Sequence, residues 1–167
     1  MDGRIGSVVL LVAAALLVVR PWEHSQGPED GPAQARARVL RAVDGDTLEV
    51  AFDGKREDVR LIGIDTPETV KPDTPVQCFG PRASAFTHGH LDGRHVRLVF
   101  GVERRDVYGR LLAYVYFRGR LFEDELVRRG LARTLAIAPN TRFASRFQHL
   151  QGAAARAGRG LWGGCNS

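Results

Sequence analysis

The sequence predicts an α+β domain that is mainly β: a five-stranded β-barrel of the OB type with three α-helices. Five short segments alternate polar and apolar residues, as half-buried strands do. Turn-forming pairs such as Asp53-Gly54 separate neighbouring segments, which is typical of hairpins. One predicted helix follows the third strand and two follow the last. This order is not that of a parallel βαβ sheet and favours a small closed barrel.

The five strands are expected where the alternation is clearest. In chain order they are Arg38–Val43, Thr47–Phe52, a strand through Arg60 that ends at Thr66-Pro67, His95–Phe100 and Leu111–Phe117. Pro67 stops the third strand because proline cannot donate to a strand ladder. Simple alternation would put Arg60 on the same face as Ile62 and Ile64. Either Arg60 lies at an open barrel end or a bulge turns it away.

Three helices are predicted between and after the strands. They run from Gly80-Pro81 to about Leu91, from Phe122 to Arg129, and from about Asn140 to Ala157. Proline is favoured at the first position of a helix. The second helix has acids in its first turn and arginines in its last, which suits the helix dipole. We expect Val70–Cys78 to be a loop that overhangs the site described below, and Gly101–Arg110 to be a polar loop.

The N-terminal residues lie outside the predicted domain, which spans residues 37–164. Residues 5–19 are an unbroken run of apolar and small residues, at the upper length of a signal-peptide core and just short of a membrane span. Residues 21–36 are a linker rich in proline and glycine. A cleaved signal peptide over residues 1–20 and a retained membrane anchor are equally supported. Either one predicts an extracytoplasmic domain, secreted or attached to the membrane.

The charge balance favours an anionic partner. The chain has 24 Lys and Arg residues against 19 Asp and Glu, and residues 36–167 alone hold 22 basic and 15 acidic residues, a net charge of +7. Only Lys55 and Lys71 are lysines. An excess of arginine suits bidentate phosphate recognition, although biased codon usage would produce the same excess.

Cys78 and Cys165 are the only cysteines. In an exported protein, two cysteines usually form one disulfide. The bond would tie the segment before the first helix to the C-terminal tail and would stabilise the fold by about 4 kcal/mol on the chain-entropy model. A two-cysteine zinc site is the poorer interpretation, because no histidine lies at ligand spacing from either residue.

Two turns carry acids that can meet at the end of the barrel. Asp46 follows the first strand, and Asp65-Thr66 ends the third. Two carboxylates and a backbone carbonyl, completed by water, make an oxygen-rich site for a hard divalent cation. Calcium fits this set better than zinc or iron, because neither cysteine nor histidine joins it.

Arginines and a third acid accompany these turns. Arg60 precedes Asp65 by five residues, and Arg110 ends a loop in which Tyr108 offers an aromatic ring. Cleavage of a phosphodiester needs positive charge around the transition state and a base for the attacking water. Glu68 is the candidate for that base.

Five blocks in this order have a counterpart in one family. They are Val43–Thr47 (VDGDT), Arg60–Glu68 (RLIGIDTPE), Phe79–Phe86 (FGPRASAF), Asp106–Tyr114 (DVYGRLLAY) and Leu126–Ala132 (LVRRGLA). From about Arg38 to Trp162, some three quarters of its length, the chain resembles the staphylococcal nuclease (thermonuclease) family. The resemblance implies an OB-type barrel with three helices and a calcium-dependent nuclease that cuts DNA and RNA, leaving 3′-phosphate and 5′-hydroxyl ends.

The resemblance also implies a role for each polar position that it matches. It assigns calcium ligands to Asp46, Asp65 and the Thr66 carbonyl, the general base to Glu68, phosphate binding to Arg60 and Arg110, and a place near the nucleotide's terminal phosphate to Tyr108. The chain departs from the family in three places. Residues 135–139 lack the tyrosines that flank the base, the loop before Cys78 is poor in basic residues, and the cysteine pair is foreign to the type member.

Two other functions compete with a nuclease. A non-catalytic OB-fold module would bind single-stranded nucleic acid without cutting it, and a structural calcium protein would be held at a membrane by residues 5–19. The acids and arginines together favour the nuclease, which we expect to be a monomer acting on DNA and RNA.

Overall fold

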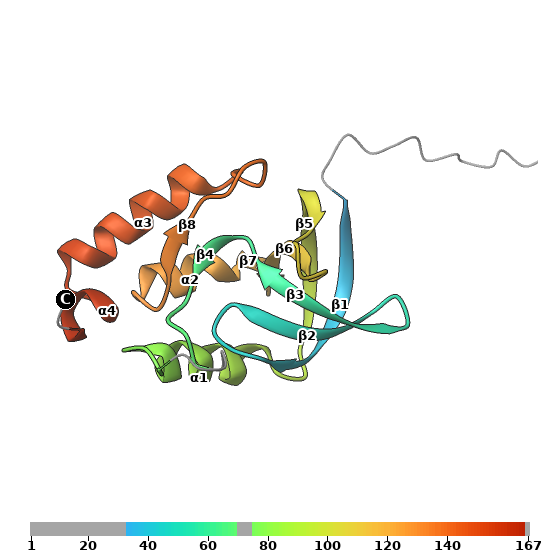
Figure 1. Ribbon diagram of the computed structural model, residues 1–167, viewed down its shortest axis with the longest axis horizontal. Coiled ribbons are helices and arrows are strands. Elements are labelled where there is room, and N and C mark those ends of the chain that lie inside the picture. The colour runs from blue at the N-terminus through green and yellow to red at the C-terminus, as the bar shows by residue number, and fades with distance from the viewer. Residues whose placement is uncertain (1–32, 70–74, 166–167) are drawn as a thin grey trace, which may run out of the picture.

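The computed structural model describes residues 33–69 and 75–165, which form a β-barrel and the helices that pack on it (Figure 1). Its five strands, in their order around the barrel, are β3 (Lys55–Leu61), β2 (Thr47–Phe52), β1 (Gln34–Ala42), β5 (His95–Arg105) and β6 (Leu111–Phe117). Neighbours in this order are antiparallel, and β3 also pairs in parallel with β6, which closes the barrel. The mixed five-stranded barrel confirms the predicted fold class.

Alternating apolar side chains fill the barrel. Leu48 and Val50 of β2 are fully buried, whereas Ala51 is exposed. The same pattern in the other strands buries Val39, Val59, Leu98 and Val115. Each fully buried side chain of this size contributes about 1.5–3 kcal/mol. The barrel interior is therefore the main source of stability and a rigid base for the turns at its ends.

Helices cover the barrel from below and from one side (Figure 1). They are α1 (Gly80–Leu91), α2 (Phe122–Arg128), α3 (Ala144–Arg156) and the one-turn α4 (Leu161–Gly164). Three of them confirm the predicted helices, and α4 is additional. No helix in the described part of the chain is long and apolar enough to cross a membrane. The apolar run over residues 5–19 lies outside the described residues.

The prediction of a loop over Gly101–Arg110 was wrong in its first half, because β5 continues to Arg105. The pairing of β5 with β6 shifts register between Phe100 and Arg105, so the strand continues past polar residues. Asn140 holds this part of β5: its Nδ2 donates to the Glu103 carbonyl at 2.9 Å, and its Oδ1 accepts the Glu103 N–H at 3.1 Å. Asn140 was predicted to begin the last long helix. In the structure α3 begins at Ala144, and Asn140 lies before it.

A break in the third predicted strand separates Arg60 from the face of Ile62 and Ile64. β3 ends at Leu61, and a separate strand β4 (Gly63–Asp65) pairs with β8 (Arg133–Leu135). Gly63 has φ +84°, and a Cβ there would lie 2.6 Å from the Phe147 ring. Only glycine can therefore make this turn. Because β3 pairs regularly through Arg60, this side chain points away from the buried Val59 and Leu61. The break after Leu61 interrupts the alternation, so that Ile62 and Ile64 are buried and the Ile64 carbonyl accepts from Arg60 Nη1.

Candidate active site

The predicted acidic turns meet in a tight contact between the Asp46 carboxylate and the Thr66 backbone. The Thr66 N–H donates to Asp46 Oδ2 at 2.6 Å, and both residues are buried. A Cβ at Gly45 would lie 2.7 Å from the Thr66 hydroxyl oxygen. The Asp-Gly-Asp turn therefore needs its glycine for this close approach. The contact joins the turn between β1 and β2 to the end of β4.

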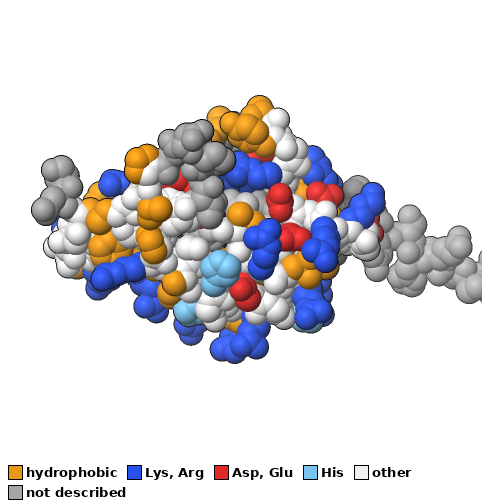
Figure 2. Space-filling model, turned by 60° about the horizontal axis from the view of Figure 1, so that its bottom comes forward, with side chains coloured by type: hydrophobic (Ala, Val, Ile, Leu, Met, Phe, Trp, Pro, Cys, Tyr) orange, Lys and Arg blue, Asp and Glu red, His pale blue; other side chains and the backbone are white. Residues whose placement is uncertain are grey.

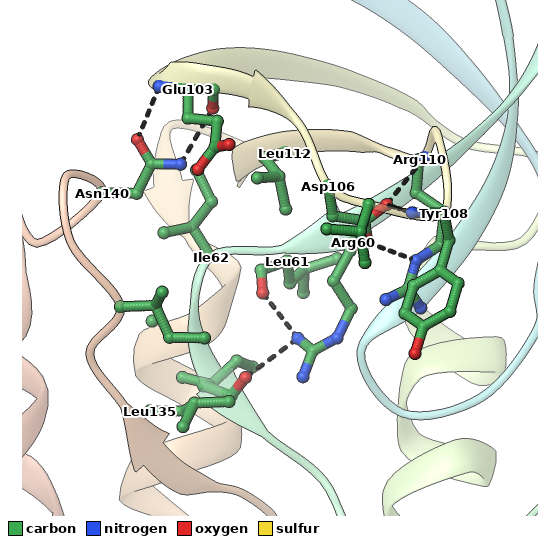
Figure 3. A pocket seen from close by; sticks show the side chains of 14 residues that line it. Arg60, Leu61, Ile62, Glu103, Asp106, Tyr108, Arg110, Leu112, Leu135 and Asn140 are labelled. Atoms are coloured by element: carbon green, nitrogen blue, oxygen red, sulfur yellow. Dashed lines mark hydrogen bonds and ion pairs between the residues drawn. The ribbon is translucent and has the colours of Figure 1, made fainter.

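Arg60 connects the two carboxylates. Its Nη2 lies 3.2 Å from Asp46 Oδ2 and 2.9 Å from Asp65 Oδ1. Its Nη1 donates to the carbonyl oxygens of Leu61 at 2.6 Å and Ile64 at 2.9 Å (Figure 3). Because one guanidinium nitrogen contacts both acids, the two carboxylates face the same small volume.

The electrostatic environment of Asp46 is finely balanced. Burial raises the pKa of its carboxyl from 3.8 to about 6, against the opposing effect of the nearby Arg60 charge. The carboxylates of Asp44 and Asp65 push the pKa up, and the Thr66 N–H lowers it. A cation placed beside Asp46 would favour its ionised form, so the site gains from binding one.

The donor chemistry fits a hard divalent cation. Asp46 and Asp65 offer carboxylate oxygens, and Thr66 can add its backbone carbonyl. No cluster of three or more His, Cys, Asp or Glu side chains in the described ranges could hold a metal ion. The Asp65 side chain is 57% exposed, so water has access to the site. These residues suit a cation that keeps several water ligands, and they do not suit a closed zinc site.

Glu68 follows this cluster by two residues and is held through its backbone. The Glu68 N–H donates to Gln77 Oε1 at 3.1 Å, and the Gln77 N–H donates to the Glu68 carbonyl at 2.9 Å. The Thr69 N–H donates to Glu68 Oε1 at 2.8 Å. Sequence reasoning assigned no role to Gln77, and nothing in its spacing pointed to one.

Asp106 organises the turn that carries Arg110. Its Oδ1 accepts the N–H groups of Tyr108 and Arg110, both at 3.0 Å, and its Oδ2 accepts Arg110 Nε at 2.7 Å. Asp106 was not a predicted site residue, although an aspartate that begins a turn ending in Gly-Arg is a recognisable signal. The Arg110 guanidinium lies 5.4 Å from the centre of the Tyr108 ring, and Tyr108 is 80% exposed.

A cavity of about 340 Å³ brings the two arginines together (Figure 3). Arg60 and Arg110 lie at one end, and the Glu103–Asn140 pair lies at the other. Leu135 and Ile137 form an exposed apolar wall. Neither Asp46 nor Glu68 is among the lining residues. The structure therefore separates a largely apolar pocket from the acidic cluster beside it, with Arg60 at the boundary.

Charges of both signs surround the barrel surface. In the view of Figure 2, Lys and Arg side chains lie next to Asp and Glu side chains. Arg41 and Arg56 both pair with Glu49, and Arg105 pairs with Glu57. These three arginines are thus paired on the barrel surface, whereas Arg60 and Arg110, which also pair with acids, border the cavity.

The chain also matches known proteins over most of its length. Residues 58–164 match the family described as "Staphylococcal nuclease homologue". The chain belongs to the staphylococcal nuclease family. It is 38% identical over 160 residues to the thermonuclease of Staphylococcus hyicus, an alignment that covers 93% of this chain and 95% of that protein. It is 40% identical over 161 residues to the thermonuclease of Staphylococcus intermedius, with 92% and 95% covered.

A third relative matches a shorter part of the chain. Endonuclease YncB of Bacillus subtilis (strain 168) is 43% identical over 110 residues, which cover 65% of this chain and 52% of that protein. By homology this member of the staphylococcal nuclease family is a thermonuclease-like nuclease, a hydrolase.

Proposed function

We propose that this nuclease is a calcium-dependent enzyme that hydrolyses phosphodiester bonds of DNA and RNA with little sugar specificity and leaves 3′-phosphate ends. The observation that carries the proposal is the position of Arg60. Its guanidinium contacts two carboxylates from separate turns and also borders the cavity that contains Arg110. Cation ligands and phosphate ligands are therefore adjacent, as cleavage of a phosphodiester requires.

Asp46, Asp65 and the Thr66 carbonyl would hold the calcium ion. When bound, the ion supplies positive charge that neutralises a phosphate oxygen and lowers the pKa of bound water. Calcium suits the site because every donor is oxygen and water has access. Arg60 and the Thr66 N–H keep the two carboxylates in place.

The protein groups that act on the phosphodiester are Glu68, Arg60 and Arg110. Glu68 accepts a proton from the attacking water as oxygen adds in line to phosphorus. Arg60 uses Nη1 and Nη2 for protein contacts, which leaves Nε for the phosphate. Asp106 occupies Arg110 Nε, so the two terminal nitrogens of Arg110 remain for the phosphate and the leaving 5′-oxygen.

The apolar wall of the cavity supports weak base selectivity. Leu135 is 40% exposed and Ile137 is 61% exposed, and residues 135–139 include no aromatic ring. Stacking of about 1–3 kcal/mol per base on this segment is therefore missing. Leucine and isoleucine contact any base through its apolar surface without reading its edges, so we expect binding to depend mainly on the phosphate.

The disulfide supports an extracytoplasmic location. Cys78 and Cys165 are joined with an S–S distance of 2.08 Å. Disulfides persist in oxidising compartments and are rare in reducing ones. We therefore propose that the enzyme is exported. Attachment to a membrane through residues 5–19 stays a prediction.

The test is cleavage of plasmid DNA and of RNA in calcium and in chelator, with a Glu68→Gln variant beside the parent. We expect both substrates to be degraded in calcium but not in chelator. The rate of cleavage should be at least about 100-fold lower in the variant. Substrate that stays intact in calcium but is retarded on a gel would overturn the proposal in favour of a binding module.

A further inference from the structure

Gln77 contacts the backbone of Glu68 from both directions. Its N–H donates to the Glu68 carbonyl at 2.9 Å, and its side-chain Oε1 accepts the Glu68 N–H at 3.1 Å. The backbone N–H and carbonyl of Glu68 thus both form hydrogen bonds with one residue, which lies nine positions later in the chain. Such a reciprocal pair fixes the Glu68 backbone more firmly than either bond could alone.

The carboxylate of Glu68 depends on this backbone. The Thr69 N–H donates to Glu68 Oε1 at 2.8 Å, so the direction of the side chain follows the geometry of residues 68 and 69. On the other side, a Cβ at Gly80 would lie 2.8 Å from the Glu68 carbonyl oxygen. The start of α1 therefore packs directly on the segment that carries the acid.

Gln77 is itself anchored by the disulfide. The next residue, Cys78, is bonded to Cys165, 87 residues later in the chain. Cys165 follows α4, whose Leu161 is buried and donates its N–H to the Gly130 carbonyl at 2.9 Å. The Gly80 N–H donates to the Gln77 carbonyl at 2.9 Å. Gln77 is thus held between the C-terminal tail and the start of α1.

We propose that Gln77 is a positioning residue for Glu68, and that the Cys78–Cys165 disulfide keeps Gln77 in place, so that reduction of the bond lowers turnover. The inference rests on the proposed role of Glu68 as general base. Neither Gln77 nor Cys78 borders the cavity between Arg60 and Arg110, although both line a smaller cavity with Asp65 and Thr66. Loss of the contact should therefore change the position of the base and leave the two phosphate-binding arginines in place.

The first experiment compares Gln77→Ala with two other variants. Gln77→Glu keeps an acceptor oxygen for the Glu68 N–H. Gln34→Ala is the matched control, because Gln34 is also exposed and accepts one side-chain hydrogen bond, from Arg97 Nη1 at 3.0 Å on another part of the barrel. Misplacement of a catalytic group by about 1 Å can cost up to about 100-fold.

We expect Gln77→Ala to lower kcat by about 10-fold with KM unchanged, Gln77→Glu to recover most of the loss, and Gln34→Ala to match the parent. A parent protein that does not cut nucleic acid would overturn the proposed function. A parent that cuts, with the same kcat as Gln77→Ala, would overturn the inference alone. An equal loss in Gln77→Glu would also overturn it, since a side-chain acceptor is then not what matters.

The second experiment tests the disulfide. We expect reduction of the disulfide in the full protein to lower kcat in the parent. In Gln77→Ala, reduction should lower kcat little further, because both changes release the contact between Gln77 and Glu68. Turnover is measured at a temperature where circular dichroism shows the reduced protein to be folded. The Cys78→Ser, Cys165→Ser double variant should behave like the reduced parent. Equal fold-losses on reduction in the parent and in Gln77→Ala would overturn the role of the disulfide.

A third measurement does not depend on activity. Amide hydrogen exchange at Glu68 should accelerate in Gln77→Ala and in the reduced parent, and should be unchanged in Gln34→Ala. Unchanged exchange at Glu68 in Gln77→Ala would show that Gln77 does not hold this backbone in solution.

Discussion

Asp46 and Glu123 are both buried acids, yet their surroundings differ. Asp46 is 4% exposed, accepts the Thr66 N–H and lies beside the Arg60 guanidinium. Glu123 is fully buried in the first turn of α2, and its Oε1 accepts the Val115 N–H at 2.9 Å. Its Oε2 has no hydrogen-bond partner in the described part of the chain. Burial raises the pKa of Asp46 to about 6 and that of Glu123 to about 8.

The difference shows what makes a buried acid useful. At neutral pH, Glu123 keeps its proton, because a buried carboxylate without a nearby positive charge is costly. It therefore acts as a neutral hydrogen-bonding group between α2 and β6. Asp46 is ionised at neutral pH with help from Arg60, and a second acid from another turn faces the same volume. Of these two acids, only Asp46 is therefore ready to bind a cation at neutral pH.

The largest expected effect separates the two acids by activity. Asp46→Asn should lower kcat/KM by at least about 100-fold, because it removes a charge from the proposed calcium site. Asparagine keeps an oxygen for the Thr66 N–H, so the variant should stay folded. Glu123→Gln is the matched control and should retain parental activity. A comparable loss of activity in Glu123→Gln would break the comparison.

The second prediction concerns stability and pH. The folded state holds the Glu123 proton up to about pH 8, whereas the unfolded chain releases it near 4.5. The free energy of unfolding therefore falls as pH rises between these values. Glu123→Gln should remove this loss and make the protein more stable than the parent at pH 9, by a few kcal/mol at about 1.4 kcal/mol per pKa unit.

Urea unfolding of the parent and Glu123→Gln at pH 5 and pH 9 would measure that difference. At pH 5 the two proteins should have similar free energies of unfolding. A stability difference that is the same at both pH values would mean that Glu123 does not titrate in this range.

A smaller effect should follow if Asp46 is made to resemble Glu123. In Arg60→Met the opposing positive charge is gone, so the pKa of Asp46 should rise above 6. The folded state would then hold the Asp46 proton to a higher pH. Between pH 5 and pH 8, the free energy of unfolding of the variant should therefore fall by on the order of 1 kcal/mol more than that of the parent. Thermal unfolding at the two pH values gives the comparison. If the free energy of unfolding falls equally in the variant and the parent, Arg60 does not influence the pKa of the Asp46 carboxyl.

Stabilisation by calcium is expected to be of similar size. Calcium at ten times its dissociation constant should raise the free energy of unfolding by about 1.4 kcal/mol at pH 8. The gain should diminish below pH 6, because Asp46 must release its proton to bind the ion. Asp46→Asn should show little gain at either pH. Equal calcium stabilisation of the parent at pH 5 and pH 8 would remove Asp46 from the ligand set.

The sequence by itself determined the barrel, the helices and the residue types of the site. Strand periodicity is local, so Thr47–Phe52 and Leu111–Phe117 were predicted with the bounds they have in the structure. The blocks around Asp46, Arg60 and Arg110 indicated the family, because side-chain chemistry at fixed spacing is written directly in the chain.

The tertiary structure alone decided how these residues meet. The contact of Arg60 with the Ile64 carbonyl depends on a turn at Gly63, where the positive φ and the Phe147 ring, 84 residues further along, require glycine. The inward face of the α2 first turn, which buries Glu123, depends on packing against β6. The contact of Gln77 with Glu68 joins residues nine positions apart in the chain. Such relations depend on contacts between distant segments, which local propensity and charge pattern do not encode.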